Sequence, residues 1–251
     1  MLCLTSIILA GCGGGSAEEA SYEKAIENYR ASGRAAVSVA QDIRLSDGST
    51  VMTSKLYGLL QVENPNGEKT SASMQSTGIT LNLGGEDMEL IMNTYYKDST
   101  LYTSFRGNNY AKECDWKTAE AEIGPFAAPL SGVEAEDFQK MEKTDEENQS
   151  VYNFEITGEN AGKIPGIREQ WNRMAESYGS DSEIAFQSAS GQLIVGSNDN
   201  LPQEEVLTVT GTIQAGERAI QVTEELKLSF AYGEIVNVEI PDVSSYQKIS
   251  N

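Results

Sequence analysis

Few side chains in this sequence could do chemistry, and the cysteines are the first to consider. The 251 residues contain three cysteines and no histidine. The absence of histidine excludes serine–histidine–aspartate and cysteine–histidine sites, and with them the usual zinc sites. Cys114 therefore has no base to activate it, and we expect an incidental, partly buried thiol. The glycines at 13–15 do not form a phosphate loop, because no strand precedes them and no lysine follows.

The carboxylates are too numerous for their pairing to carry information. The chain has 38 acidic and 18 basic residues, for a formal net charge of −20. The clusters at 134–137 and 145–147 could bind calcium weakly, but they lack the spaced ligands and central glycine of a dedicated loop. A solvated acidic surface is the favoured interpretation. The sequence thus predicts no enzyme, no metal site and no cofactor, and so acidic a surface excludes nucleic-acid binding.

One cysteine does have a chemical context, near the N-terminus. Residues 1–10 form an uncharged apolar run, too short to span a bilayer but typical of a signal peptide. The motif Leu9-Ala10-Gly11-Cys12 that ends this run matches the lipobox of bacterial lipoproteins, and a glycine-rich tether follows it. We therefore expect cleavage before Cys12 and acylation of its thiol. The alternative is a buried N-terminal strand that ends in Gly-Cys.

The expected lipid determines where the protein works. Two acyl chains on Cys12 would hold it stably on a membrane, which predicts an extracytoplasmic, lipid-anchored protein, on the outer face of the cytoplasmic membrane in a Gram-positive source. No lysine or arginine precedes Lys24, although signal peptides begin with positive charge, so we expect the true start to lie upstream. The acidic body is expected to stand off the membrane as a monomer.

The elements beyond the tether alternate between helices and strands. Helical spacing of apolar residues predicts a helix over 17–32 with Tyr22, Ala25, Ile26 and Tyr29 on one face. A period of two then predicts an antiparallel meander of at least five strands: 35–45, 50–63, a strand to Leu83, 87–96 and 100–106. Its turns are expected at Asp47-Gly48, Asn66-Gly67, Gly84-Gly85 and 97–99. Gln41 interrupts the apolar face of the first strand.

The second half repeats the helix–meander order. Pro125 and Pro129 limit 112–140 to short helical pieces and loop, which run into the acidic stretch 134–147. A strand over 151–157 and a helix over 163–178 follow. The helix carries an apolar stripe of Ile164, Ile167, Trp171, Met174 and Tyr178. Four strands are predicted at 182–196, 203–214, 219–232 and 235–240, and Glu224 breaks the apolar face of the third.

The order of elements predicts an α+β fold with helices packed on an antiparallel sheet. We expect a signal peptide at 1–11, a tether at 12–19, one domain at 20–243 and a C-terminal tail at 244–251. The alternative is two small domains, one per meander, divided near residue 145.

Several short motifs carry a resemblance to a known group. These are the lipobox, the stretch Tyr-Tyr-Lys-Asp-Ser-Thr-Leu-Tyr at 95–102, Asp-Asn-Leu-Pro at 199–202 and Val-Glu-Ile-Pro at 238–241. Together they resemble the uncharacterised bacterial lipoproteins related to the LolA, LppX and LprG carriers. The resemblance implies an unclosed antiparallel half-barrel with helices on its concave face, and a cavity between sheet and helices that holds acyl chains.

The sequence is compatible with two functions. The resemblance implies binding of an apolar ligand, a lipid or acyl chain, with a cavity lined by Trp116, Phe126, Leu130, Ile167, Trp171 and Met174. The alternative for these side chains is an ordinary core, since a helix stripe normally packs on a sheet. The alternative function is a non-enzymatic interaction module that contacts a partner protein or wall polymer through its convex face.

Overall fold

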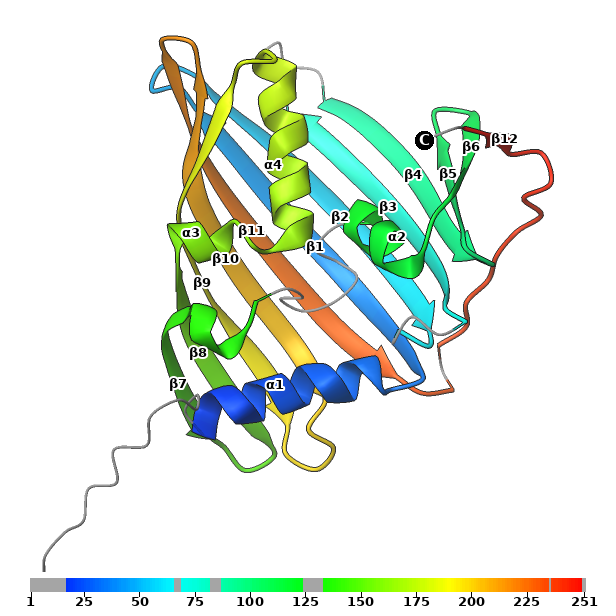
Figure 1. The fold of residues 1–251 in the computed structure, drawn as a ribbon, viewed down its shortest axis with the longest axis vertical. Coiled ribbons are helices and arrows are strands. Elements are labelled where there is room, and N and C mark those ends of the chain that lie inside the picture. The colour runs from blue at the N-terminus through cyan, green and yellow to red at the C-terminus, as the bar shows by residue number, and fades with distance from the viewer. Residues whose placement is uncertain (1–16, 66–68, 82–86, 124–132, 235, 250–251) are drawn as a thin grey trace, which may run out of the picture.

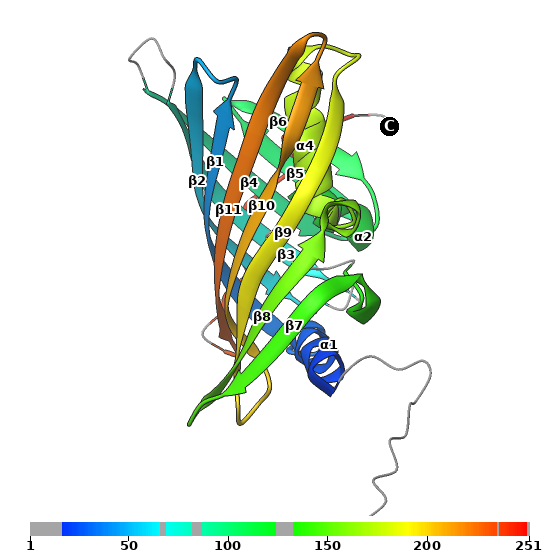
Figure 2. The same ribbon diagram turned by 90° about the vertical axis from the view of Figure 1, so that its left-hand side faces the viewer.

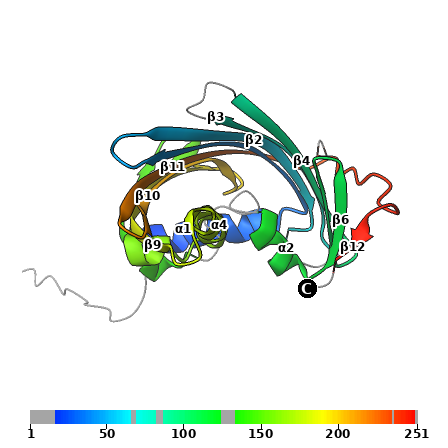
Figure 3. The ribbon, with the colours of Figure 1, turned by 90° about the horizontal axis from the view of Figure 1, so that it is seen from above.

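The computed structural model describes residues 17–65, 69–81, 87–123, 133–234 and 236–249 (Figure 1). In this part of the chain twelve strands form one sheet in the order β12-β6-β5-β4-β3-β2-β1-β11-β10-β9-β8-β7. All neighbouring strands are antiparallel except β12, which runs parallel to β6. The sheet is curved and unclosed, and the helices lie on its concave side (Figure 3). The predicted fold class is therefore confirmed.

The strands of the first meander are long and closely match the sequence prediction. Their bounds are β1 Arg34–Ser46, β2 Val51–Glu63, β3 Ser71–Leu81, β4 Asp87–Lys97, β5 Thr100–Phe105 and β6 Asn108–Glu113. The last of these was not predicted as a strand. The turn that leads into it places Arg106 and Gly107 at positive φ, a conformation that favours tight hairpins.

The second half completes the sheet from the opposite edge. Its bounds are β7 Phe138–Asp145, β8 Gln149–Thr157, β9 Glu183–Gly196, β10 Pro202–Ala215, β11 Arg218–Tyr232 and β12 Gln247–Lys248. β1 pairs with both β2 and β11, so that Val37 lies opposite Leu60 on one side and Phe230 on the other. The two predicted meanders are therefore continuous through β1.

Helices cover only one face of this sheet, as the side view shows (Figure 2). Their bounds are α1 Ala17–Arg30, α2 Trp116–Ile123, α3 Gly158–Ala161 and α4 Pro165–Tyr178, with a short 3₁₀ turn at Ala135–Asp137. α1 packs on β7 and β10, α4 on β9 and β10, and α2 on β4 and α4. The predicted faces of α1 and α4 are the buried ones: Tyr22, Ala25, Tyr29, Ile167 and Trp171 are at most 2% exposed.

Two sequence predictions were wrong. The segment 112–140, expected to hold short helical pieces and loop, ends in β7, which runs on within the acidic stretch 134–147 and forms one edge of the sheet. A bulge between Phe138 and Lys140 breaks the alternation that would have shown this strand. The strand expected at 235–240 is absent over 236–240, where Val236 is the one buried residue. A segment with a single buried side chain has no apolar face to hold it in a sheet.

Some expectations lie outside the described residues. These are the turns at Asn66-Gly67 and Gly84-Gly85, the prolines Pro125 and Pro129, and the N-terminal motif with its tether. β12 lies in the segment assigned to a C-terminal tail, where the Ile249 amide donates to the Ala111 carbonyl.

Candidate functional site

Trp171 anchors α4 on the concave face of the sheet. Its side chain is fully buried, and its ring stacks on Phe186 of β9 with 4.7 Å between centroids. The ring can approach β10 because Gly211 has no side chain: a Cβ there would lie 2.7 Å from Trp171 Cζ3 and 2.5 Å from the Ala185 carbonyl oxygen. α4 is thus held on the sheet by the stacking of Trp171 on Phe186, which requires a glycine at position 211.

A buried polar network joins α4 to the middle of the sheet. Glu224 on β11 accepts a hydrogen bond from Trp171 Nε1 at 2.6 Å and another from Gln41 Nε2 at 2.5 Å. Gln41 and Gln170 of α4 also exchange amide hydrogen bonds of 2.9 and 3.2 Å. The two polar residues that interrupt the apolar patterns of β1 and β11 therefore meet and satisfy each other, as buried polar groups must.

Burial dominates the electrostatics of this network. Glu224 is fully buried, which raises the pKa of its carboxyl to about 7, while the hydrogen bonds from Trp171 and Gln41 act in the opposite direction. Loss of solvation penalises the charged form more than two neutral donors stabilise it. The network can therefore change charge near neutral pH.

A second buried carboxyl lies nearer α1. Glu205 on β10 is 1% exposed, and burial raises its pKa to about 8. Burial, and then the charge of Glu205, raise the pKa of Tyr22. Glu205 Oε2 accepts no hydrogen bond from the described protein groups. This carboxyl is therefore expected to be largely protonated at neutral pH.

The concave face of β2–β5 differs from that of β9–β11, because no described helix packs mainly on β2 or β3. In Figure 1 α2 crosses in front of part of these strands, and no labelled helix lies over the rest, between α4 and β5. Some inward side chains there, such as Leu60 and Tyr96, are buried. Others are apolar and only half-buried: Met52, Leu56, Leu90, Met92 and Phe105. By contrast, the inward residues of β10 and β11 are almost completely buried.

Small residues form the floor of this region. Gly78 lies between Leu56 and Leu90 in one cross-strand row. The next cross-strand row runs from Gly58 through Ser76 and Met92 to Phe105. The Ser76 hydroxyl donates a hydrogen bond to the Met92 carbonyl. We call these eight residues, from Met52 to Phe105, the concave trough. It has apolar side chains at its margins and small residues along its middle, and the end of the Met74 side chain lies over Gly58, 3.2 Å from where a Cβ would stand.

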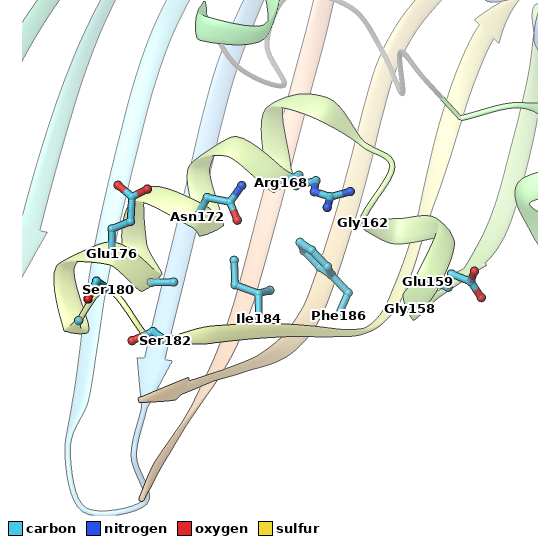
Figure 4. A pocket seen from close by; sticks show the side chains of 12 residues that line it. Gly158, Glu159, Gly162, Arg168, Asn172, Glu176, Ser180, Ser182, Ile184 and Phe186 are labelled. Carbon is cyan, nitrogen blue, oxygen red and sulfur yellow. The ribbon is translucent and has the colours of Figure 1, made fainter. Parts of the chain in front are cut away.

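A separate polar groove of about 570 Å³ lies on the other side of α4, against β9 (Figure 4). Arg168, Asn172 and Glu176 line it from the helix at four-residue steps, and Ile184 and Phe186 point toward them from β9. No motif in the sequence marks these residues as a site. The four-residue spacing of polar side chains on the helix face beside the apolar stripe was the signal that could have found them.

Four of the predicted cavity residues lie in the described part of the chain: Trp116, Ile167, Trp171 and Met174. Ile167 and Trp171 are fully buried in core packing, and Met174 is partly buried against it. Trp116 is 7% exposed and packs on Tyr96, with ring centroids 5.2 Å apart. Phe126, Leu130 and Cys12 lie outside the described residues. The trough residues were visible in the sequence as strand alternation, but only the register shows which of them lack a covering helix.

Other kinds of site find little support in the described residues. No group of three acidic or cysteine side chains there could hold a metal ion. Cys114 is partly buried, and burial raises the pKa of its thiol. None of the described helices is long and apolar enough to cross a membrane.

Comparison with known proteins gives likenesses of fold only. No protein-family model and no curated protein sequence matches this chain. Among solved structures it is similar to LprF from Mycobacterium bovis, with 9% identity, a TM-score of 0.45, and 91% of this chain and 99% of that chain covered. It is also similar to a domain named for outer membrane lipoprotein sorting from Vibrio parahaemolyticus, with 9% identity, a TM-score of 0.28 and coverage of 90% and 96%.

Proposed function

We propose that the protein is an extracytoplasmic lipoprotein whose concave trough binds an acyl chain of a lipid. The observation that carries this proposal is the group of half-buried apolar side chains in the concave trough. Among the described helices α2 packs on β4, and none packs mainly on β2 or β3. Soluble proteins seldom leave a contiguous apolar surface without a partner. Each methylene group that an acyl chain buries there contributes about 0.8 kcal/mol.

The geometry of the trough suits a chain better than a compact ligand. Its floor of Gly58, Ser76 and Gly78 crosses two neighbouring strands, and a Cβ at Gly78 would meet nothing closer than 3.8 Å. A long, narrow ligand can follow such a floor with Leu56, Leu90 and Met92 on its sides. The acidic surface repels anionic headgroups, so we expect the polar end of the lipid to remain in solvent.

Two adjacent residues provide a matched test. Leu90 faces the trough, and Ile91 lies on the convex face with 53% of its surface exposed. Leu90→Glu should abolish the fluorescence change of a fluorescent fatty acid mixed with the purified domain, because a carboxylate in the trough is costly to desolvate. Ile91→Glu should leave binding unchanged. Equal loss in both variants, or binding unaffected by Leu90→Glu, would contradict the proposal.

A second function is favoured by the convex face. Tyr57, Leu59 and Ile91 are large apolar residues with 51%, 43% and 53% of their surfaces exposed. Such residues are typical of protein interfaces. If the protein is instead an interaction module, Ile91→Glu should weaken capture of its cellular partner while Leu90→Glu leaves it intact, which is the reverse of the pattern above.

The anchor is also a proposal, and it rests on the sequence motif at Leu9-Ala10-Gly11-Cys12. With an intact leader, the protein should label with palmitate and partition into detergent. Cys12→Ser should remove both properties, since the thiol is the acceptor. Equal labelling of the two proteins would contradict lipidation at this cysteine.

A further inference from the structure

We propose that the open edge of β9, together with the polar groove beside α4, binds a short basic peptide segment of a partner protein as an added β-strand. This inference concerns a different surface from the concave trough and does not depend on lipid binding there.

The first part of β9 is paired with a strand on one side and not on the other. It pairs with β10 from Glu183 to Val195. β8 reaches no further along β9 than Ser188, which lies opposite Thr157. In the described part of the chain, residues 183–187 therefore have no strand on the β8 side. An open strand edge presents alternate N–H and C=O groups that an extended segment can pair with.

The reason for this open edge is that the chain leaves the sheet after β8. It turns into α3, and Gly158 comes so near β9 that a Cβ on it would lie 2.2 Å from the Phe186 carbonyl oxygen. α3 therefore closes one end of the edge, whereas 183–185 stay open beyond it, where β9 extends past α3 in Figure 1. A peptide could add a few residues there before it meets α3.

The groove gives room for the side chains of such a peptide. Figure 4 shows Ile184 and Phe186 directed from β9 toward α4, where Asn172 and Glu176 also line the groove. The space of about 570 Å³ extends from this floor to α3. A strand added beside β9 would direct every second side chain to the same side as Ile184 and Phe186, under α4.

Charge decides the kind of peptide. The groove is lined by Glu159 and Glu176 against Arg168, and Asp181 lies between the lining residues Ser180 and Ser182. Glu183 begins the open edge, and Lys163, near Glu159, is paired with Asp137. The carboxylates surround the open edge, so lysine and arginine side chains on the peptide would be attracted to them. The whole chain, at −20, adds to this preference.

The test uses a labelled peptide, acetyl-Lys-Val-Lys-Val-Lys-Val-amide, with the whole domain and fluorescence anisotropy as the readout. Two further peptides carry N-methyl groups on one or the other set of alternate amides. We expect one methylated peptide to lose about tenfold or more in affinity, since the amides facing β9 can no longer donate, and the other to bind normally. Hydrogen exchange should slow at 183–185.

Charge reversal provides the second arm. Glu176→Lys should weaken the basic peptide several-fold, and Glu155→Lys, at an exposed position of β8, should not. If both methylated peptides bind equally well, the binding is non-specific attraction to an acidic surface, and the proposal is overturned. So would exchange protection elsewhere in the sheet, or self-association of the domain that blocks the same edge.

Discussion

Glu224 shows how one residue can explain two irregularities in the sequence. It interrupts the apolar face of β11, and Gln41 interrupts that of β1. Each alone looks like a defect, but the register places them near each other beneath Trp171. The sequence could predict both interruptions and could not predict their meeting, because that depends on a pairing between strands about 180 residues apart in the chain.

The raised pKa of Glu224 predicts an unusual pH dependence of stability. For an acid whose folded pKa exceeds its unfolded value of 4.5, the folded state binds the proton more tightly. Stability is then fully present below about pH 4.5 and is lost as pH rises through about 7. The same holds for Glu205, up to about 8. The free energy of unfolding should therefore fall between about pH 5 and pH 8.

Glu224→Gln tests the contribution of this one carboxyl. The amide removes the charge but keeps an acceptor for Trp171 Nε1, and the amides of Gln41 and Gln170 can turn to accept from it. At about pH 8 the variant should be more stable than the parent by about 3 kcal/mol at most. Urea unfolding at a series of pH values measures this. A parent and variant with the same slope against pH would show that Glu224 does not titrate in this range.

At the level of elements, the sequence predicted the helices more accurately than the edge strands of the sheet. The stripe on α4 and the alternation of β11 each have a single apolar face to bury, so local pattern defines them. β7 and β12 are edge strands with few buried residues, and their place depends on a neighbour rather than on their own pattern. The trough likewise required knowledge of where the helices lie.

Glycine substitutions test the seating of α4. Gly211→Ala should destabilise the domain by about 1–3 kcal/mol, because the new methyl group would overlap Trp171 and the Ala185 carbonyl. Gly78→Ala is the matched control in another strand, where a Cβ meets nothing within 3.8 Å, and it should be nearly neutral. Thermal unfolding of both variants measures the difference. Equal effects would mean that Trp171 does not depend on close approach to β10.

At the scale of the whole molecule, the sheet is continuous from β7 to β12. β1 holds the two halves together through long pairings with β2 and β11. Neither half can bury its inner strands without the other, so we predict a single cooperative unfolding transition.

The two tryptophans allow a direct test, because the sequence contains only Trp116 and Trp171. They lie on different helices, α2 and α4. In Trp171→Phe the remaining fluorescence reports the α2 region, and in Trp116→Phe it reports the α4 region. Within each variant, urea unfolding by fluorescence and by far-ultraviolet circular dichroism should coincide. Fluorescence transitions that precede the loss of sheet would favour two independently folding units.

Photochemical cross-linking tests the central claim, that an acyl chain lies in the concave trough, most directly. The purified domain would be incubated with a fatty acid that carries a diazirine near its terminal methyl group, irradiated, and digested for mass spectrometry. We predict adducts on β2–β5 at the inward residues Leu56, Leu90, Met92 and Phe105, and their loss in the presence of excess unlabelled fatty acid. Adducts confined to the convex residues Tyr57 and Ile91, or none that unlabelled fatty acid displaces, would contradict the claim.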